Sequence, residues 1–226
     1  MSDQKAVTPF HFVGCVELRE TMGRKAADVQ QLMTTIDEAP LDSIYYHTHS
    51  YFLRYEHGPS LFPSDFATWV AVSVRDRVLS ERLGLIDPFE FRDVEALRAE
   101  IVATIDDHLK SLWNVPRLTH GDPFEFVSSH IIEVDLELSA QSLQAFREHL
   151  STVDRSVLFN HICEAKIRKG RHSGDFVLWI GSESGLNLPD LATQIAAIQP
   201  IGLTLEGIRT RTLDLLDHWL ARTVPA

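Results

Sequence analysis

Two short stretches of the chain bring histidine together with tyrosine or glutamate, and these side chains offer acid–base chemistry. The stretches are Tyr45-Tyr46-His47-Thr48-His49 and His161-Ile162-Cys163-Glu164. A histidine ring gains and loses a proton near neutral pH, and a nearby carboxylate can orient the ring or share its proton. Residues three apart share one face of a helix, so Glu164 is placed to act on His161. The pattern predicts either an acid–base site, with His47, His161 and Glu164 as catalytic residues, or buried histidines that hydrogen-bond to polar neighbours.

The same residues do not predict a metal site. Carboxylate-bridged centres in helical bundles use a glutamate followed three residues later by a histidine, whereas here His161 precedes Glu164. His47 and His49 are two residues apart, and on a helix such side chains point about 200° away from each other. The chain has 2 cysteines, too few for a cysteine-based zinc site. We therefore expect no metal ligands and no cofactor.

An aspartate, a phenylalanine and a tryptophan recur at the same spacing in the two halves of the chain. Asp65-Phe66-Ala67-Thr68-Trp69 reappears as Asp175-Phe176-Val177-Leu178-Trp179. Each aspartate stands just before an apolar helical pattern, where a carboxylate caps the helix by accepting hydrogen bonds from its first amides. Each tryptophan, four residues later, is expected to anchor that helix in the core. The alternative is that the two aspartates are acidic ligands at the rim of a pocket.

If the protein has a ligand pocket, we expect it where the tyrosine-rich stretch faces the second histidine stretch. Arg168 follows Glu164 by four residues, a spacing that also favours a simple ion pair on a helix. The residues expected to bind the ligand are Tyr45, Tyr46, His49, Asp65, Trp69, Arg168, Asp175 and Trp179.

These motifs belong to a longer internal repeat. Phe10-His11-Phe12 resembles Phe124-Glu125-Phe126, and Glu95-Ala96-Leu97-Arg98 resembles Glu206-Gly207-Ile208-Arg209, with the order of all matching segments kept. One pair of similar segments could arise by chance, but several pairs in the same order along the chain are not expected by chance. The pattern predicts a tandem duplication, with a first repeat at 1–116 and a second at 117–226, packed as one globule.

Each repeat is expected to contain a strand followed by four helices. Apolar residues alternate with other residues over 10–18 and again over 132–138, a period of two that is typical of half-buried strands. Helical spacing follows, for example in Ile44–Tyr55, which we expect to end at His57-Gly58-Pro59, and in Val94–Leu112. Two short strands need each other or a helical surface for stability. The predicted fold is mainly α with a small β element (α+β), and its two units are related by pseudo-twofold symmetry.

Taken together, the motifs resemble an uncharacterised family of bacterial and archaeal proteins, a domain of unknown function. The resemblance rests on Tyr45-Tyr46-His47-Thr48-His49, on the two Asp-Phe-x-x-Trp signatures and on His161-x-x-Glu164-Ala165, and it covers about Phe10 to Leu220. The sequence departs from the family pattern at Asn160 and Lys166, where aromatic or basic residues are usual. The resemblance brings no activity, cofactor or partner with it.

Composition excludes several classes of function. The chain has 226 residues and a formal net charge of -11, whereas nucleic acids and anionic membranes need a basic surface. No apolar run approaches the ~18 residues of a spanning helix, and Met1–Lys5 lacks the pattern of a signal peptide. The glycine-rich phosphate loops and the esterase and zinc-protease motifs are also absent from the sequence. We expect a soluble cytoplasmic protein that binds neither nucleic acid nor membranes.

Two functional hypotheses remain open. The leading one is a non-catalytic protein that binds a small polar molecule or a protein partner, or acts as a scaffold, because the repeated signatures look structural and the histidine stretches differ between repeats. The alternative is an enzyme, a hydrolase or lyase of a small polar metabolite that uses histidine and glutamate, with or without one metal ion. Association into a homo-oligomer is compatible with both hypotheses.

Overall fold

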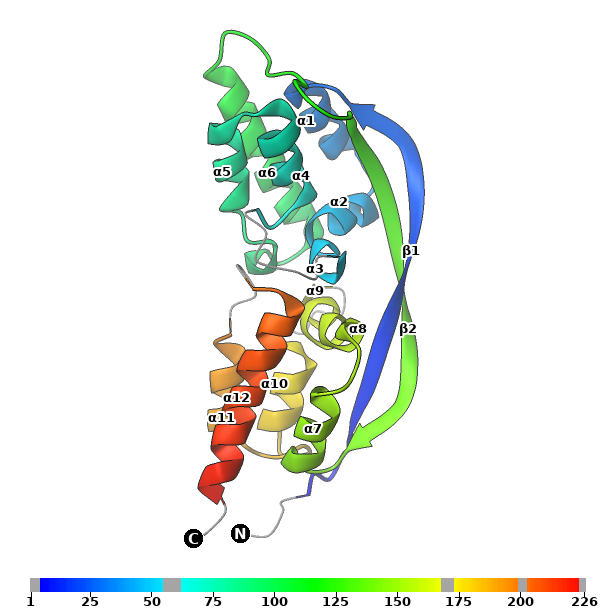
Figure 1. Ribbon diagram of the computed structural model, residues 1–226, viewed down its shortest axis with the longest axis vertical. Helices are drawn as coiled ribbons and strands as arrows, with labels where there is room; N and C mark the ends of the chain where they lie inside the picture. Colours follow the sequence, from blue (N-terminus) through cyan, green and yellow to red (C-terminus); the bar gives the residue numbers. More distant parts are fainter. Residues whose placement is uncertain (1–4, 55–61, 168–172, 199–202, 224–226) are drawn as a thin grey trace. The chain divides into compact units, whose positions relative to one another are not determined.

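Helices dominate the structure, with one two-stranded antiparallel sheet beside them. The computed structural model describes residues 5–54, 62–167, 173–198 and 203–223 (Figure 1). This confirms the predicted mainly helical α+β class. In the described ranges, every helix is too short or too polar to cross a bilayer. Contacts divide the chain into two compact units, unit 1 with residues 1–16 and 132–226 and unit 2 with residues 17–131.

The two strands are longer than the sequence predicted. β1 is Phe10–Ala26 and β2 is Phe124–Ala140, each of 17 residues, so the prediction of short strands over 10–18 and 132–138 was wrong in length. Apolar alternation marks the start of β1, which packs on helices, and the end of β2, which is exposed. The start of β1 belongs with the end of β2 to unit 1, and the start of β2 belongs with the end of β1 to unit 2. Each compact unit therefore takes parts from both predicted repeats.

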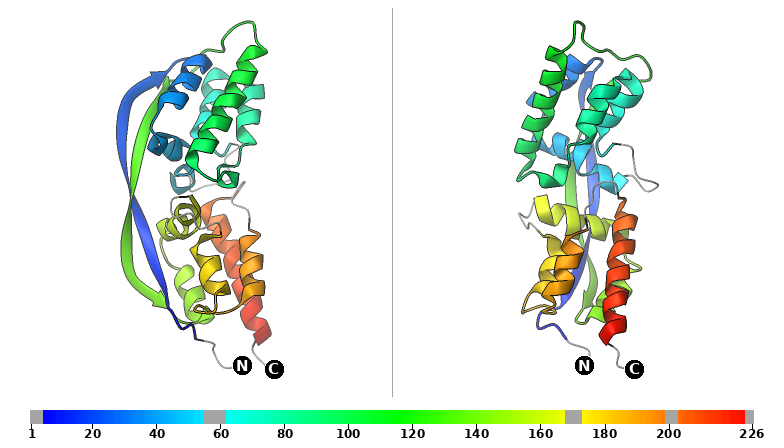
Figure 2. Two further views of the ribbon diagram at one scale, coloured as in Figure 1. Left: turned by 180° about the vertical axis from the view of Figure 1, so that it is seen from behind. Right: turned by 90° about the vertical axis from the view of Figure 1, so that its left-hand side faces the viewer.

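The helices of unit 2 cover one face of its strand segments (Figures 1 and 2). Phe124 and Phe126, from the start of β2, enter a core with Leu32, Phe66 and Leu97. Each such buried side chain contributes about 1.5–3 kcal/mol relative to an exposed one. The helical elements are α1 (Val29–Glu38), α2 (Leu41–Thr48), α3 (Tyr51–Arg54), α4 (Asp65–Trp69), the π-helix η1 (Val70–Val74), α5 (Arg77–Gly84), the 3-10 helix η2 (Pro88–Glu90) and α6 (Val94–Lys110).

Unit 1 uses the start of β1 in the same way. Phe10 and Phe12 are buried against Phe146, with ring centroids 5.3 and 5.5 Å away, and Phe10 also contacts Phe176 and Trp179. The elements of unit 1 are α7 (Leu143–Leu150), α8 (Arg155–Leu158), the π-helix η3 (Phe159–Glu164), α9 (Ala165–Ile167), α10 (Gly174–Gly181), α11 (Pro189–Ala196) and α12 (Leu205–Thr223).

Three local predictions need correction. The single helix expected over Ile44–Tyr55 is divided into α2 and α3, and its predicted end at His57-Gly58-Pro59 lies outside the described residues. Asp65 does not cap α4: the cap is Ser64, whose Oγ accepts a hydrogen bond from the Ala67 amide at 3.2 Å. Asp175 lies inside the first turn of α10, which begins at Gly174. Both aspartates thus have side chains available for another contact.

Candidate functional site

His47 joins two helices of unit 2 to the start of β2. Its ring lies on α2 and is 3% exposed, and its Nδ1 is 2.8 Å from Oδ2 of Asp65, the first residue of α4. The backbone amide of Val127 donates a hydrogen bond to Nε2 at 3.1 Å. An Nε2 that accepts carries no proton, so the ring proton is on Nδ1 and is donated to Asp65. Burial lowers the pKa of His47 although the Asp65 carboxylate raises it, which agrees with this neutral ring.

His161 makes the same set of contacts in unit 1. Its Nδ1 is 2.8 Å from Oδ2 of Asp175, and the Val13 amide of β1 donates to its Nε2 at 2.9 Å. The ring is 4% exposed and packs on Phe10, just as His47 packs on Phe124, with centroids 4.8 and 4.7 Å apart. In each unit, then, one histidine links two helical segments to a strand.

This arrangement leaves neither histidine with a ring nitrogen for a substrate. A general base must accept a proton through an unoccupied nitrogen. In His47 and His161 that nitrogen, Nε2, already accepts from a strand amide. Proton transfer would require the ring to release the strand, leaving a part-buried amide without its acceptor at a cost of about 1–3 kcal/mol. The geometry suits a fixed structural link.

Arg54 extends the polar cluster of unit 2. Its Nη2 donates to Asp65 Oδ2 at 2.6 Å and to the Tyr46 carbonyl at 2.9 Å. Its guanidinium group lies 4.1 Å from the centroid of the Tyr46 ring, over the ring face, and that of Arg19 lies 5.8 Å from it. Burial is the largest influence on Tyr46 and raises the pKa of its phenol, while both arginines lower it. Arg54 thus connects Asp65, and through it His47, to an aromatic surface.

Two buried polar atoms of this cluster have no hydrogen-bond partner among the residues that the structure describes. They are Nε of Arg54 and Oε1 of Glu17. The other carboxylate oxygen of Glu17 accepts from Arg19 at 2.9 Å, and the Glu17 side chain is 3% exposed. A buried donor and a buried acceptor without partners are unusual in native proteins and are normally met by a water or a ligand.

The remaining predicted binding residues of unit 2 are packed in its interior. His49 is 1% exposed, stacks on Tyr45 with centroids 4.8 Å apart, and has Nε2 3.2 Å from the Pro88 carbonyl oxygen. Trp69 is 8% exposed and donates from Nε1 to the Asp122 carbonyl at 3.1 Å. These contacts fix the local fold around His47.

In unit 1 the predicted residues are spread over η3 and α10. Trp179 donates from Nε1 to the Thr8 carbonyl at 2.8 Å, the counterpart of the Trp69 contact. Glu164 is buried at the end of η3, and because this segment is a π-helix, three-residue spacing no longer places it on one α-helical face with His161. Burial raises the pKa of the Cys163 thiol, so this cysteine is unreactive. Arg168 lies outside the described residues.

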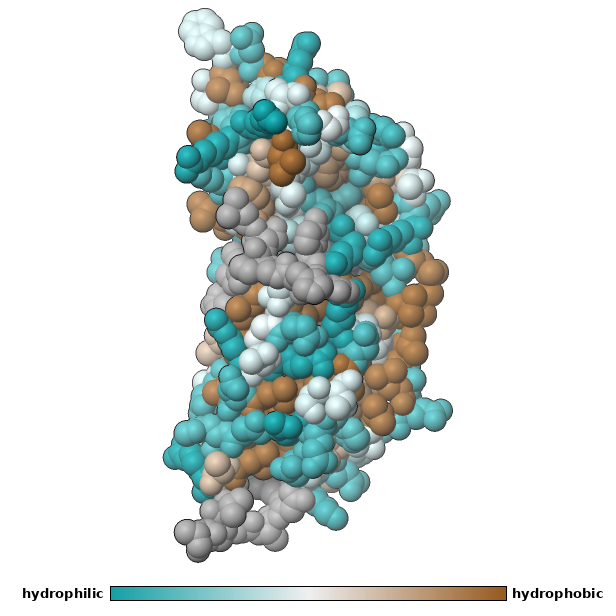
Figure 3. Space-filling view, viewed as in Figure 1, coloured by the Kyte–Doolittle hydropathy of each residue, from teal (hydrophilic) through white to brown (hydrophobic). Residues whose placement is uncertain are grey.

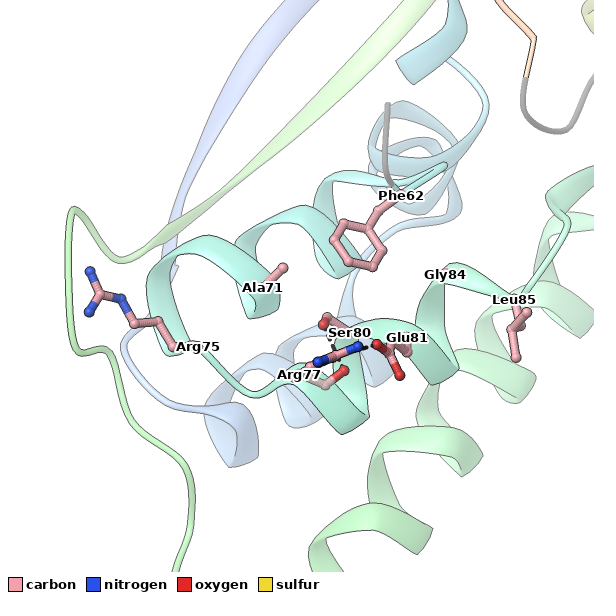
Figure 4. A pocket seen from close by; sticks show the side chains of 8 residues that line it. All are labelled: Phe62, Ala71, Arg75, Arg77, Ser80, Glu81, Gly84 and Leu85. Atoms are coloured by element: carbon pink, nitrogen blue, oxygen red, sulfur yellow. Dashed lines mark hydrogen bonds and ion pairs between the residues drawn. The ribbon is translucent and has the colours of Figure 1, made fainter. Parts of the chain in front are cut away.

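A hollow on unit 2 is lined by none of the predicted site residues. It has a volume of about 730 Å³ and lies between η1 and α5, with Phe62 at one side and the Arg77–Glu81 ion pair along α5 (Figure 4). In unit 1, a cavity of about 30 Å³ beside His161 and Gly174 has room for about one water. Within the ranges that the structure describes, no three His, Cys, Asp or Glu residues are grouped to hold a metal ion.

Comparison with known proteins gives the family and the fold. A model of a family of unknown function, DUF5752, matches residues 7–217. The chain belongs to this family. The chain is also similar to a solved structure, OrfY from Thermoproteus tenax, with a TM-score of 0.77 and 25% identity over 96% of this chain and 97% of that one. No curated protein matches the chain.

The match confirms the prediction that the chain belongs to a family of unknown function. What the site can do chemically therefore follows from its geometry. Sequence analysis missed Arg54, Glu17 and the two strand amides that meet the histidines. One signal for Arg54 was present, because Arg54 follows His47 by seven residues and Arg168 follows His161 by seven. The strand amides gave no signal, since backbone groups are not visible in residue types.

Proposed function

We propose that this DUF5752 protein is a non-catalytic binding or scaffold protein. The observation that carries the proposal is that His47 and His161 have both ring nitrogens occupied, by an aspartate and by a strand amide. The residues with the strongest potential for acid–base chemistry are therefore used to hold strands on helices. A scaffold needs such links in both units, whereas a single active site does not.

A tandem duplication with pseudo-twofold symmetry explains why the link occurs twice. His47 and His161 are 114 positions apart, and so are Val13 and Val127, while Asp65 and Asp175 are 110 apart. The surrounding polar groups have diverged, because Tyr46 of unit 2 corresponds to Asn160 of unit 1 in the same numbering shift. The two repeats thus share the contact of histidine with aspartate and strand amide, but they differ in the polar side chains around it. We expect this difference if both repeats need the same fold and only one of them, or neither, needs a reactive site.

The proposed binding region is the polar cluster of unit 2 around Tyr46, Arg54 and Asp65. Its unpartnered Glu17 Oε1 and Arg54 Nε favour a small polar ligand that both donates and accepts hydrogen bonds. We keep Arg168, Asp175 and Trp179 as proposed binding residues of the second repeat. The net charge of -11 supports partners other than nucleic acid. The cytoplasm remains the proposed location.

The enzyme alternative assigns catalysis to His47, His161 and Glu164, with or without one metal ion. It requires an Nε2 that is free of its strand amide while substrate is bound. The hydrogen bonds from Val127 and Val13 favour the non-catalytic proposal over this alternative.

Native mass spectrometry of the protein, purified from its own host without chelator, tests the proposal. We expect the chain to carry a stoichiometric small molecule or protein partner that it releases unchanged. The enzyme alternative is tested in parallel by incubating the protein with a metabolite extract of the host and measuring whether any metabolite is consumed. Consumption of a metabolite that stops in a His47→Gln variant of unchanged stability would establish the enzyme and overturn the proposal.

A further inference from the structure

The second half of each strand is exposed along almost its whole length. In residues 18–25 of β1, all but Met22 are exposed, and in residues 132–139 of β2, all but Leu136 are exposed. Among the described residues the sheet has only these two strands, so each strand has one edge without a neighbouring strand. Edges of this length are templates for pairing with another strand.

In the first half of each strand, side chains from the helical segments occupy part of the edge. At Val13 the amide binds His161, and the carbonyl accepts from Asn160 Nδ2 at 3.1 Å. At Val127 the amide binds His47. The exposed second halves are therefore the parts of the ribbon that are left for another chain, and Figure 3 shows apolar surface along the side where β1 and β2 run.

The two exposed edges carry opposite charge. Residues 132–139 contain three acidic side chains, Glu133, Asp135 and Glu137, and no basic one, whereas residues 18–25 contain Arg19, Arg24 and Lys25 with a single acid, Glu20. Their net charges are -3 and +2. Between its acids the β2 segment exposes apolar side chains, with Ile132 48%, Val134 40% and Leu138 37% exposed. One chain therefore offers both an acidic amphipathic edge and a basic edge.

We propose that the acidic edge at 132–139 of one copy pairs, as an added strand, with the basic edge at 18–25 of a second copy. Backbone hydrogen bonds supply the attraction, and the opposite charges select this pairing over acidic-to-acidic or basic-to-basic contacts. Because the contact joins two different surfaces, it is heterologous, and each bound copy still offers one open edge. The assembly grows with concentration and has no fixed size unless a ring closes.

The backbone limits how far the added strand extends. Glu137 and Gly23 have positive φ angles of 56° and 66°, a conformation that interrupts regular pairing as a bulge does. The continuous ladder is therefore confined to 132–136 and 18–22, with Arg24 and Lys25 flanking it. Within one copy, Arg24 and Lys25 lie 3.5 and 3.6 Å from Glu38 and Glu125. Such exposed ion pairs contribute ~0–1 kcal/mol, so exchanging them for contacts with a second copy costs little.

The second copy is favoured as the occupant because this chain itself carries the complementary edge. Repulsion between copies of charge -11 is screened beyond about 8 Å at physiological salt, while charges in contact across the edge are screened less. The inference does not rest on the proposed function, because it concerns the ribbon edges and not the polar cluster around Arg54. It can therefore fail or hold independently.

Sedimentation velocity of the full chain, from low micromolar to near millimolar concentration, tests the pairing. We expect the average mass to rise from that of the monomer through dimer and beyond. We expect Glu133→Lys/Asp135→Lys and Arg24→Glu/Lys25→Glu to be monomeric throughout. Asp190→Lys/Asp214→Lys, with the same charge change as the first variant but on exposed helical sites of unit 1, is the matched control for that variant and assembles like the unchanged chain. Circular dichroism verifies that all three variants are folded.

Mixing the two monomeric variants gives the decisive result. In the first variant, 132–139 carries a net charge of +1, and in the second, 18–25 carries -2. Each edge of one variant therefore meets an edge of opposite charge on the other, so an equimolar mixture assembles like the unchanged chain. A monomeric unchanged chain at every concentration overturns the proposal, as does assembly that survives both pairs of substitutions. A mixture that remains monomeric shows that the edges do not pair and leads to the same conclusion.

Discussion

At the scale of single residues, His47 and His161 each join two helical segments to a strand. His47 is held by Asp65 and Val127, and Asp65 in turn binds Arg54. Removing the ring leaves the Val127 amide without an acceptor and opens a cavity among Phe66, Phe124 and Phe126. The histidine therefore contributes packing as well as hydrogen bonds.

The substitution His47→Ala is expected to lower the free energy of unfolding by about 2–4 kcal/mol, the range for loss of a buried, bonded side chain. His161→Ala should cost a similar amount, because it makes the same contacts in unit 1. Urea unfolding measures both. His130→Ala, at a side chain that is 64% exposed, is the control and should change stability by less than about 0.5 kcal/mol. Unchanged stability of His47→Ala with loss of ligand binding would instead identify a binding residue.

The pH dependence of stability follows from the same ring. Burial holds the pKa of His47 in the folded protein below its ordinary value of 6.5, so the unfolded chain binds the proton more readily. The contribution of His47 to the free energy of unfolding is fully present above about pH 6.5. It is lost as the pH falls through the lower pKa that the ring has in the folded protein. The carboxylate of Asp65 and the guanidinium of Arg54 face the ring and act in opposite directions. Unfolding measured between pH 7.5 and 5 should therefore be less pH-dependent in His47→Ala than in the unchanged chain.

At the scale of elements, two neighbouring residues at the start of α4 have different roles, and the helix cap that the sequence predicted for Asp65 is made by Ser64. Ser64 caps the helix, and Asp65 binds His47 and Arg54. We expect Ser64→Ala to cost about 1 kcal/mol, the usual value for an N-cap. Asp65→Ala should cost clearly more, about 3 kcal/mol, because it leaves a buried arginine without its ion pair. Equal losses in thermal or urea unfolding would show that Asp65 acts only on the helix end.

The success of the sequence predictions depended on whether the decisive contacts were local. Apolar periodicity identified α6 and the start of β1, since each repeats its own pattern along the chain. The partners of His47 lie 18 and 80 residues away, and those of His161 lie 14 and 148 residues away. Periodicity does not indicate such contacts. The second half of β1 escaped prediction because its exposed residues are mostly polar and do not alternate with apolar ones. The first half of β2 escaped because Ser128, Ser129 and His130 interrupt the alternation that Phe124 and Phe126 begin.

At the scale of the whole molecule, the exchange of strand segments determines which part of the chain is a folding unit. Unit 2, residues 17–131, is continuous in sequence and includes Phe124, Phe126 and Val127. The first predicted repeat, 1–116, has the same helices but ends before these residues. Its helices would leave the core site of two phenylalanines empty and His47 without its strand amide.

We therefore expect the fragment 17–131 to unfold cooperatively on heating and the fragment 1–116, which is one residue longer, to lack a cooperative transition. The two aromatic side chains alone account for about 3–6 kcal/mol of burial, a large share of the ~5–15 kcal/mol that stabilises a typical domain. Circular dichroism melting and the dispersion of amide resonances measure the difference. Replacing Phe124 and Phe126 by Ala within 17–131 provides the control and should abolish its transition. If 1–116 melts as cooperatively as 17–131, the helices of unit 2 do not depend on β2, and the strand segments act only as a connection between the units.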